Sequence, residues 1–413
     1  MTNDQRRMTK EARMTIAENG QERNQSCTML ADYFGLRISS FLRHWVFRHS
    51  SLIGRGLRQS GAVQPGKRFS MHPLLRNSVV LILAVLCLIA TQTMADDVTN
   101  PPAASKKPQR SPTFGGKQFW SDELIFHEWR IQRHALTSYC RLLDEEDYRR
   151  AGGTFAGCQE ELERLKQKLE MPPMRGRIVL VLHGLLRSRQ AMQAMCDYLE
   201  ENGDFQVLAV SYASSRRDMT AHATSLARVV TNLGNDVKEI NFVGHSMGNL
   251  VIRRYLGGVC AVVPKKRRLP RQTVMLAPPN NGSKLAERFR ENNIFRSFWG
   301  ISGIEIAELN KLEKHLATPP SFGIIAGGRG TENGNNPLIP GDDDFVVSVE
   351  ETRLPGARDF LVVPALHGSI MENERVQECT LRFLQDGHFV ASDQRQPIPI
   401  DVSPPDDRPG DQP

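Results

Sequence analysis

The stretch Gly244-His245-Ser246-Met247-Gly248 lies between two segments of different character. Residues 240–243 form a short apolar run that is typical of a buried strand, and residues 249–256 carry apolar side chains at helical spacing. The pentapeptide is therefore predicted to be a sharp strand-to-helix turn, whose two glycines leave room for neighbouring backbone. Such a turn holds a serine hydroxyl beyond the end of the sheet. Ser246 is predicted to be a nucleophile, and the alternative is a structural serine that caps the helix.

A second apolar run, residues 177–182, predicts a buried strand that leads into His183-Gly184-Leu185-Leu186. An oxyanion forms when a serine attacks a carbonyl group, and backbone NH groups can stabilise it. We expect these donors to be the NH of Leu185 in this loop and the NH of Met247 at the start of the helix after Ser246. His183 and His245 are interpreted as parts of the two loops and not as proton carriers.

A serine nucleophile also needs a base and an acid that orients the base. Three aspartates at 342–344 come after a predicted strand near residues 321–326, and His367 follows another predicted strand, 359–363. The carboxyl ends of parallel strands meet at one edge of a sheet, which is where α/β proteins build their sites. His367 is therefore the predicted base, and the alternative is a histidine on the surface.

On these motifs, residues 175–388 resemble the lipase and esterase branch of the α/β-hydrolase superfamily. The resemblance implies an α/β fold with a mostly parallel central sheet flanked by helices, and a Ser-His-Asp triad that needs no cofactor or metal. The family's acid usually lies in the pattern Asp-Gly-x-Val-x-Val, which residues 344–349 match except for Phe345 in the glycine position. Asp344 is the predicted acid, and Asp343 is the alternative.

Two further segments are predicted to be helical. Residues 121–171 carry apolar side chains every three, four or seven positions on both sides of Gly152-Gly153, which favours an antiparallel helical hairpin in front of the catalytic domain. The alternative role for this hairpin is a cap over the substrate pocket. Residues 283–316 are unusually apolar for a connection, so they either line an acyl pocket or form a flap, or they are helices packed on the sheet.

Charge is distributed unevenly along the 413 residues. Residues 1–70 hold twelve Lys or Arg against five Asp or Glu, which accounts for the whole net charge of +7. The rest of the chain is neutral overall, so the basic composition does not indicate a nucleic-acid partner.

Residues 71–95 have the pattern of a signal peptide. A basic start is followed by the twelve-residue apolar run 79–90 and by Thr93-Met94-Ala95, a suitable cleavage site. We therefore expect export to the periplasm or the extracellular space, with residues 1–70 a basic extension that is not translated. The alternative is an uncleaved membrane anchor with a basic tail.

The remaining segments are polar or irregular. Residues 96–120 are predicted to be a linker, and the Pro-rich residues 390–413 a disordered tail. Five cysteines follow residue 95, an odd number, so at least one thiol stays unpaired within the chain, and the pairing of the others stays open.

The predicted function is that of a secreted serine hydrolase that cleaves lipid or other acyl esters and contacts a membrane surface. The alternatives are an acyltransferase or amidase with the same triad, and a non-catalytic binding protein on the same fold. The sequence specifies neither the substrate nor an oligomeric state.

Overall fold

The computed structural model describes residues 117–259 and 269–400. All described residues belong to one compact unit of the chain. The predicted extension, the signal peptide and most of the predicted linker lie outside the described residues, as do residues 401–413 of the predicted tail.

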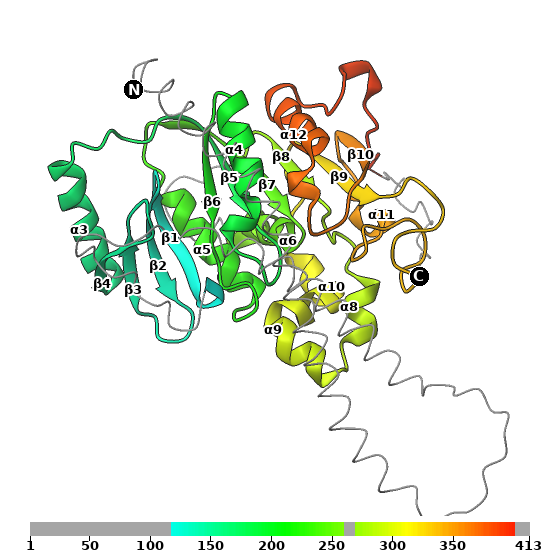
Figure 1. Ribbon diagram of the computed structural model, residues 1–413, viewed down its shortest axis with the longest axis horizontal. Coiled ribbons are helices and arrows are strands. Elements are labelled where there is room, and N and C mark those ends of the chain that lie inside the picture. Colours follow the sequence, from blue (N-terminus) through cyan, green and yellow to red (C-terminus); the bar gives the residue numbers. More distant parts are fainter. Residues whose placement is uncertain (1–116, 260–268, 401–413) are drawn as a thin grey trace, which may run out of the picture. The chain divides into compact units, whose positions relative to one another are not determined.

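The centre of the fold is a sheet of six parallel strands in the order β10-β9-β8-β7-β5-β6 (Figure 1). This confirms the predicted α/β class with a mostly parallel sheet. The strands are β5 (Gly176–Leu182), β6 (Gln206–Val210), β7 (Val237–His245), β8 (Thr273–Leu276), β9 (Phe322–Gly328) and β10 (Asp359–Pro364).

Helices cover both faces of this sheet, which explains why β5 is apolar at nearly every position. Val179 and Val181 pack on one side, with α4 and α12, whereas Ile178, Leu180 and Leu182 pack on the other, with α5 and α6. The helices are α4 (Gln193–Asn202), α5 (Met219–Thr231), α6 (Met247–Arg254) and α12 (Glu374–Asp386).

The predicted helical hairpin over residues 121–171 is wrong in its first arm. That arm is an antiparallel sheet of β1 (Trp120–Phe126), β2 (Trp129–His134), β3 (Cys140–Leu143) and β4 (Arg149–Gly153). Only the second arm is helical, as α3 (Phe155–Lys168), whose N-terminus is capped by Thr154.

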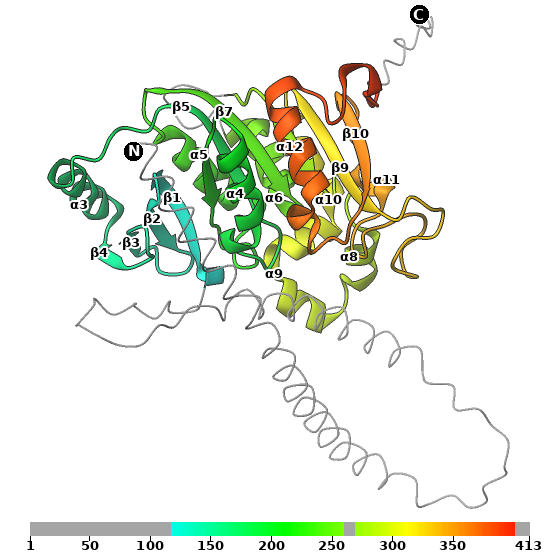
Figure 2. The same cartoon turned by 45° about the horizontal axis from the view of Figure 1, so that its top comes forward.

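Tertiary contacts explain this correction. All seven residues of β1 are buried, so a helix with one solvated face does not describe them. The carboxylate of Asp122 accepts hydrogen bonds from Arg130, Gln132 and the backbone NH of Ser211, just beyond β6. The strand arrangement thus provides partners for a buried charge and attaches the small sheet to the end of β6. The small sheet also packs next to α5 (Figure 2).

Short helices fill the connections at the carboxyl ends of β8 and β9. The α-helices are α8 (Lys284–Phe289), α9 (Asn293–Ala307), α10 (Leu309–Leu312) and α11 (Val349–Thr352).

Short irregular helices occur at other points along the described chain as well as in these connections. They are η1 (Lys117–Phe119), η2 (Arg189–Met192), η3 (Tyr255–Val259), η4 (Glu313–His315), η5 (Ile370–Glu372) and η6 (Ser392–Gln394).

The prediction of a disordered tail from residue 390 is wrong for residues 390–400. The backbone of Ile398 exchanges hydrogen bonds with Gly356 and Ala357, at 2.8 and 2.9 Å. The carboxylate of Asp359 accepts hydrogen bonds from the NH groups of Phe389 and Gln396. Backbone hydrogen bonds hold this segment, and hydrophobicity patterns do not detect them.

Four of the five cysteines after residue 95 fall in the described part of the chain. They are buried free thiols: Cys140, Cys158, Cys196 and Cys379. Among the described residues, no helix has the length and apolar character needed to cross a membrane.

Candidate active site

Ser246 occupies the turn between β7 and α6. Its backbone has φ 52° and ψ −124°, a conformation that is costly for a residue with a side chain. A Cβ on Gly244 would lie 2.3 Å from Oδ1 of Asn249, and a Cβ on Gly248 would lie 2.7 Å from the carbonyl oxygen of Leu182. The turn therefore needs both glycines, as the sequence predicts, and it directs the Ser246 hydroxyl away from the sheet.

His367 lies three residues after the end of β10, and its imidazole faces Ser246. The distance from His367 Nε2 to Ser246 Oγ is 2.9 Å. The carbonyl oxygen of His367 accepts a hydrogen bond from Nε2 of His245 at 2.9 Å. Burial lowers the pKa of His245 well below its usual value, so His245 is an uncharged donor that holds the His367 backbone.

Asp344 is the carboxylate that contacts His367. Its Oδ2 lies 2.6 Å from His367 Nδ1, and its Oδ1 accepts hydrogen bonds from the NH groups of Val346 and Val347 at 3.0 and 2.7 Å. Phe345, which stands where the family pattern has glycine, has φ 87°. The backbone thus keeps the left-handed conformation that favours glycine, even though the residue is phenylalanine.

Asp343, the alternative acid, binds a different part of the structure. Its buried carboxylate accepts hydrogen bonds from the NH groups of Asn336 and Phe345. Burial raises the pKa of Asp343. The structure therefore brings together Ser246, His367 and Asp344, and it assigns Asp343 to the folding of the preceding loop.

The loop after β5 passes directly beside Ser246. A Cβ on Gly184 would lie 3.1 Å from Cβ of Ser246, and Leu185 lines the same cavity as Ser246. Met247 is the first residue of α6, where an NH group has no acceptor within the helix. The two predicted oxyanion donors thus belong to the segments on either side of the Ser246 hydroxyl.

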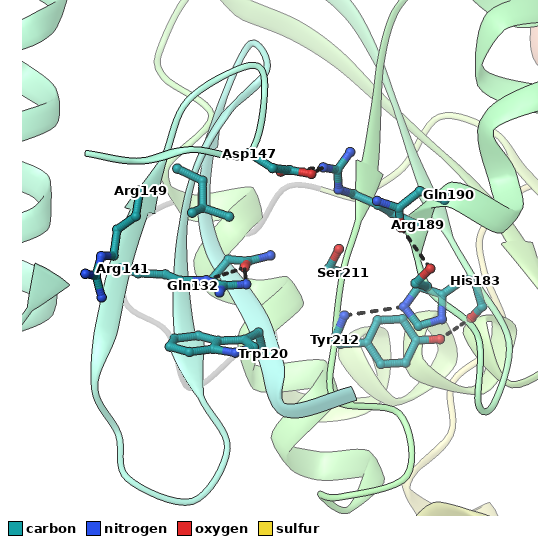
Figure 3. A pocket seen from close by; sticks show the side chains of 12 residues that line it. Trp120, Gln132, Arg141, Asp147, Arg149, His183, Arg189, Gln190, Ser211 and Tyr212 are labelled. Atoms are coloured by element: carbon teal, nitrogen blue, oxygen red, sulfur yellow. Dashed lines mark hydrogen bonds and ion pairs between the residues drawn. The ribbon is translucent and has the colours of Figure 1, made fainter. Parts of the chain in front are cut away.

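His183 stabilises this loop through its contacts with Tyr212. Its ring stacks on Tyr212 with centroids 4.2 Å apart, and the Tyr212 hydroxyl donates to the His183 carbonyl (Figure 3). Burial lowers the pKa of His183 to about 4, so the ring is uncharged near neutral pH. These contacts agree with the interpretation of His183 as a residue that shapes the loop.

A mostly apolar cavity opens at Ser246 and His367. Helices α8 and α9 contribute to it, so part of the segment 283–316 lines the pocket. None of its lining residues comes from the described residues 117–171, which therefore give no support to a cap. The apolar lining residues include Leu185, Leu186, Pro279, Ala286, Trp299, Ile306, Val346 and Val347.

Two residues of the site were not singled out for these roles from the sequence. The first is His245, which holds the backbone of His367. The second is Arg187, a buried arginine that lines the cavity four residues after His183. The only signal in the sequence was a charged residue within a loop expected at the active site. Among the described residues, there is no cluster of three His, Cys, Asp or Glu side chains that could hold a metal ion.

The central sheet, its two helical layers and the strand-turn-helix at Ser246 define an α/β-hydrolase fold. Residues 174–276 match the protein family described as "Putative serine esterase (DUF676)". At this coarse level, the chain is similar to enzymes that hydrolyse esters. A comparison with curated protein sequences found no match.

Solved structures that resemble this chain include lipases and esterases. The mature lipase BlEst2 from Bacillus licheniformis is 18% identical, with a TM-score of 0.37, and the match covers 49% of this chain and 89% of that one. Est1E from Butyrivibrio proteoclasticus is 13% identical, with a TM-score of 0.36 and coverage of 52% and 90%. A thermophilic esterase from Thermogutta terrifontis is 18% identical, with a TM-score of 0.35 and coverage of 52% and 92%.

Proposed function

We propose that this protein is a serine hydrolase that cleaves carboxylic esters of lipids or other acyl compounds through an acyl-enzyme. The observation that carries the proposal is the series of hydrogen bonds from Ser246 Oγ to His367 Nε2, at 2.9 Å, and from His367 Nδ1 to Asp344 Oδ2, at 2.6 Å. This order of groups is what a serine needs to lose its proton as it attacks a carbonyl carbon.

In this mechanism, His367 accepts the Ser246 proton and later donates it to the leaving alcohol. Asp344 holds His367 with its proton on Nδ1, so that Nε2 stays free to accept. The NH groups of Leu185 and Met247 stabilise the oxyanion of the tetrahedral intermediate. Water then attacks the acyl-enzyme, with His367 acting as the base, and releases the acid.

The lining of the cavity supports an apolar acyl group. Besides the side chains that surround Ser246, two apolar side chains of α9 face solvent: Phe298 is 42% exposed and Ile301 is 50% exposed. Apolar groups on the surface beside a lipid-ester site are suited to contact with a membrane or micelle. We therefore include lipid esters that the enzyme binds at a membrane or micelle surface among the proposed substrates.

Hydrolysis of 4-nitrophenyl esters of increasing acyl length by the full chain tests this function. We expect turnover that rises with acyl length, because the cavity wall is apolar, and that disappears in Ser246→Ala. A fluorophosphonate probe should label the native protein and leave Ser246→Ala unlabelled.

Other outcomes of these assays would favour the alternatives. Transfer of the acyl group to an added alcohol or amine in preference to water would favour an acyltransferase. Failure of both the esters and the probe to react would favour a non-catalytic binding protein.

We also propose that the protein is exported, on the pattern of residues 71–95 alone. The N-terminal sequence of protein purified from the producing cell tests this proposal. A new terminus at Asp96 would support cleavage of a signal peptide, and a terminus at or before Met71 in a membrane fraction would support an anchor.

A further inference from the structure

Arg187 is a buried positive charge in the wall of the active-site cavity. Its side chain lines the same cavity as Ser246 and His367, and the residue is 9% exposed. A Cβ on Gly368 would lie only 2.9 Å from Arg187 Nη2, so the guanidinium packs against the backbone that immediately follows His367. Arg187 is therefore a neighbour of the reacting groups and not a distant surface residue.

The guanidinium of Arg187 has no partner among residues 117–259 and 269–400. Its Nη2 is enclosed and makes no hydrogen bond, and no carboxylate of these residues comes within the 4 Å of an ion pair. Glu372 attracts the charge from a greater distance, while burial lowers the pKa of Arg187. Buried charges in proteins are normally paired, because an unpaired one loses its hydration without compensation.

Two other arginines differ from Arg187 in this respect. Arg189, the first residue of η2, donates to the Asp147 carboxylate, and Arg141 donates twice to Gln132 (Figure 3). Both line a separate hollow behind the loop, whose polar groups largely satisfy one another. By contrast, no Asp or Glu of the described chain lines the cavity at Ser246.

We propose that Arg187 determines specificity by binding a negatively charged group of the substrate, so that the preferred ester carries a carboxylate or a phosphate close to the scissile bond. This inference rests on the proposed ester-hydrolase function. The inference adds a chemical class of substrate to that function, because an anion would supply the partner that the buried guanidinium lacks among the described residues.

Two properties of Arg187 favour such binding. The side chain is already largely desolvated in the folded protein, so binding an anion costs it little further hydration. Guanidinium groups also form paired, charge-assisted hydrogen bonds with the oxygens of carboxylates and phosphates. A charge-assisted hydrogen bond of this kind corresponds to a preference of roughly ten- to a hundredfold.

The test compares esters that differ only in charge. For a carboxylate in the acyl group, the pair is mono-4-nitrophenyl adipate and 4-nitrophenyl hexanoate. For a phosphate in the alcohol, the pair is 1-hexanoylglycerol 3-phosphate and 1-hexanoylglycerol. In each pair, the ratio of kcat/KM for the anionic ester to that for the neutral ester is measured with the full chain, and uncatalysed hydrolysis is subtracted.

We expect the ratio to exceed one in at least one pair, which also identifies the source of the charge. It should fall about ten- to a hundredfold in Arg187→Met and recover in part in Arg187→Lys, which restores the charge without the paired geometry. Arg189→Met is the matched control, since it removes the same charge two residues further along the chain, at a position outside the cavity. It should leave the ratio unchanged.

Three results would overturn the inference: ratios below one in both pairs of the native protein, a ratio that Arg187→Met leaves unchanged, or an equal fall in the control. The first needs no variant, so a folding defect cannot obscure it. Hydrolysis of the neutral esters without a preference for charge would refute only the role of Arg187. Absence of hydrolysis in all four esters would refute the proposed function itself.

Discussion

Replacement of Asp344 by asparagine is the sharpest test of the proposed mechanism, because the structure dictates how the new amide must sit. Asp344 Oδ1 accepts two backbone hydrogen bonds, from Val346 and Val347, and Oδ2 faces His367 Nδ1. An amide nitrogen cannot take the Oδ1 position, since it would point at two NH donors. The asparagine therefore presents its NH₂ group to His367.

That orientation forces His367 into the wrong tautomer. Nδ1 must then accept the amide hydrogen, so the ring proton moves to Nε2, which can no longer accept the proton of Ser246. A change of this kind in a serine triad lowers kcat by about 10³- to 10⁴-fold. This loss corresponds to about 4–5.5 kcal/mol of transition-state stabilisation.

Asp343→Asn is the matched control. The two carboxylates are adjacent in sequence and both are buried, but Asp343 accepts hydrogen bonds from the NH groups of Asn336 and Phe345. Its replacement should cost about 1–3 kcal/mol of unfolding free energy and leave kcat within about tenfold of native. Steady-state hydrolysis of a 4-nitrophenyl ester and denaturant unfolding measure the two effects. An equal loss of kcat in both folded variants, or a native kcat in Asp344→Asn, would refute the reasoning.

Three further predictions concern stability. Gly248→Ala should cost about 1–3 kcal/mol of unfolding free energy and lower activity, because its Cβ would lie 2.7 Å from the Leu182 carbonyl oxygen. Gly157→Ala, at an exposed position of α3, should instead stabilise the protein by up to about 1 kcal/mol. Thermal unfolding compares the two variants, and equal effects would contradict the packing argument. Burial raises the Glu305 pKa to about 7, so the native unfolding free energy should fall as pH rises from about 4.5 to 7. Denaturant unfolding of Glu305→Gln across that range should show a relative gain of about 1–2 kcal/mol after solvent screening, and a pH-independent difference would contradict the assignment. Burial lowers the His222 pKa to about 3, so the free energy of unfolding should fall by about 1.4 kcal/mol for each pH unit below about 6.5. His222→Gln should therefore have a shallower acid-unfolding curve than the native protein, and a curve as steep as the native one would contradict this assignment.

Local sequence determined the parts of the fold whose interactions are close in the chain. The apolar run of β5, fully buried from Ile178 onward, and the turn from β7 to α6 lie where the pattern predicts them. Strand, turn and helix signals arise from backbone sterics and from the spacing of neighbouring side chains, which a single sequence displays. The α/β class followed from these signals.

Only the tertiary structure decided which distant groups meet. Residues 120–134 form β1 and β2, although their apolar spacing also fits a helix. The buried charge of Asp122 accepts hydrogen bonds from Arg130 and Gln132 on β2 and from the NH of Ser211, just beyond β6. Asp343 and Asp344 look alike in the sequence, and their different roles come from the loops against which each side chain folds. Within residues 117–259 and 269–400, Arg187 lacks a partner because of where the chain folds around it. Long-range contacts, burial and charge compensation depend on the assembled core, so no local pattern contains them.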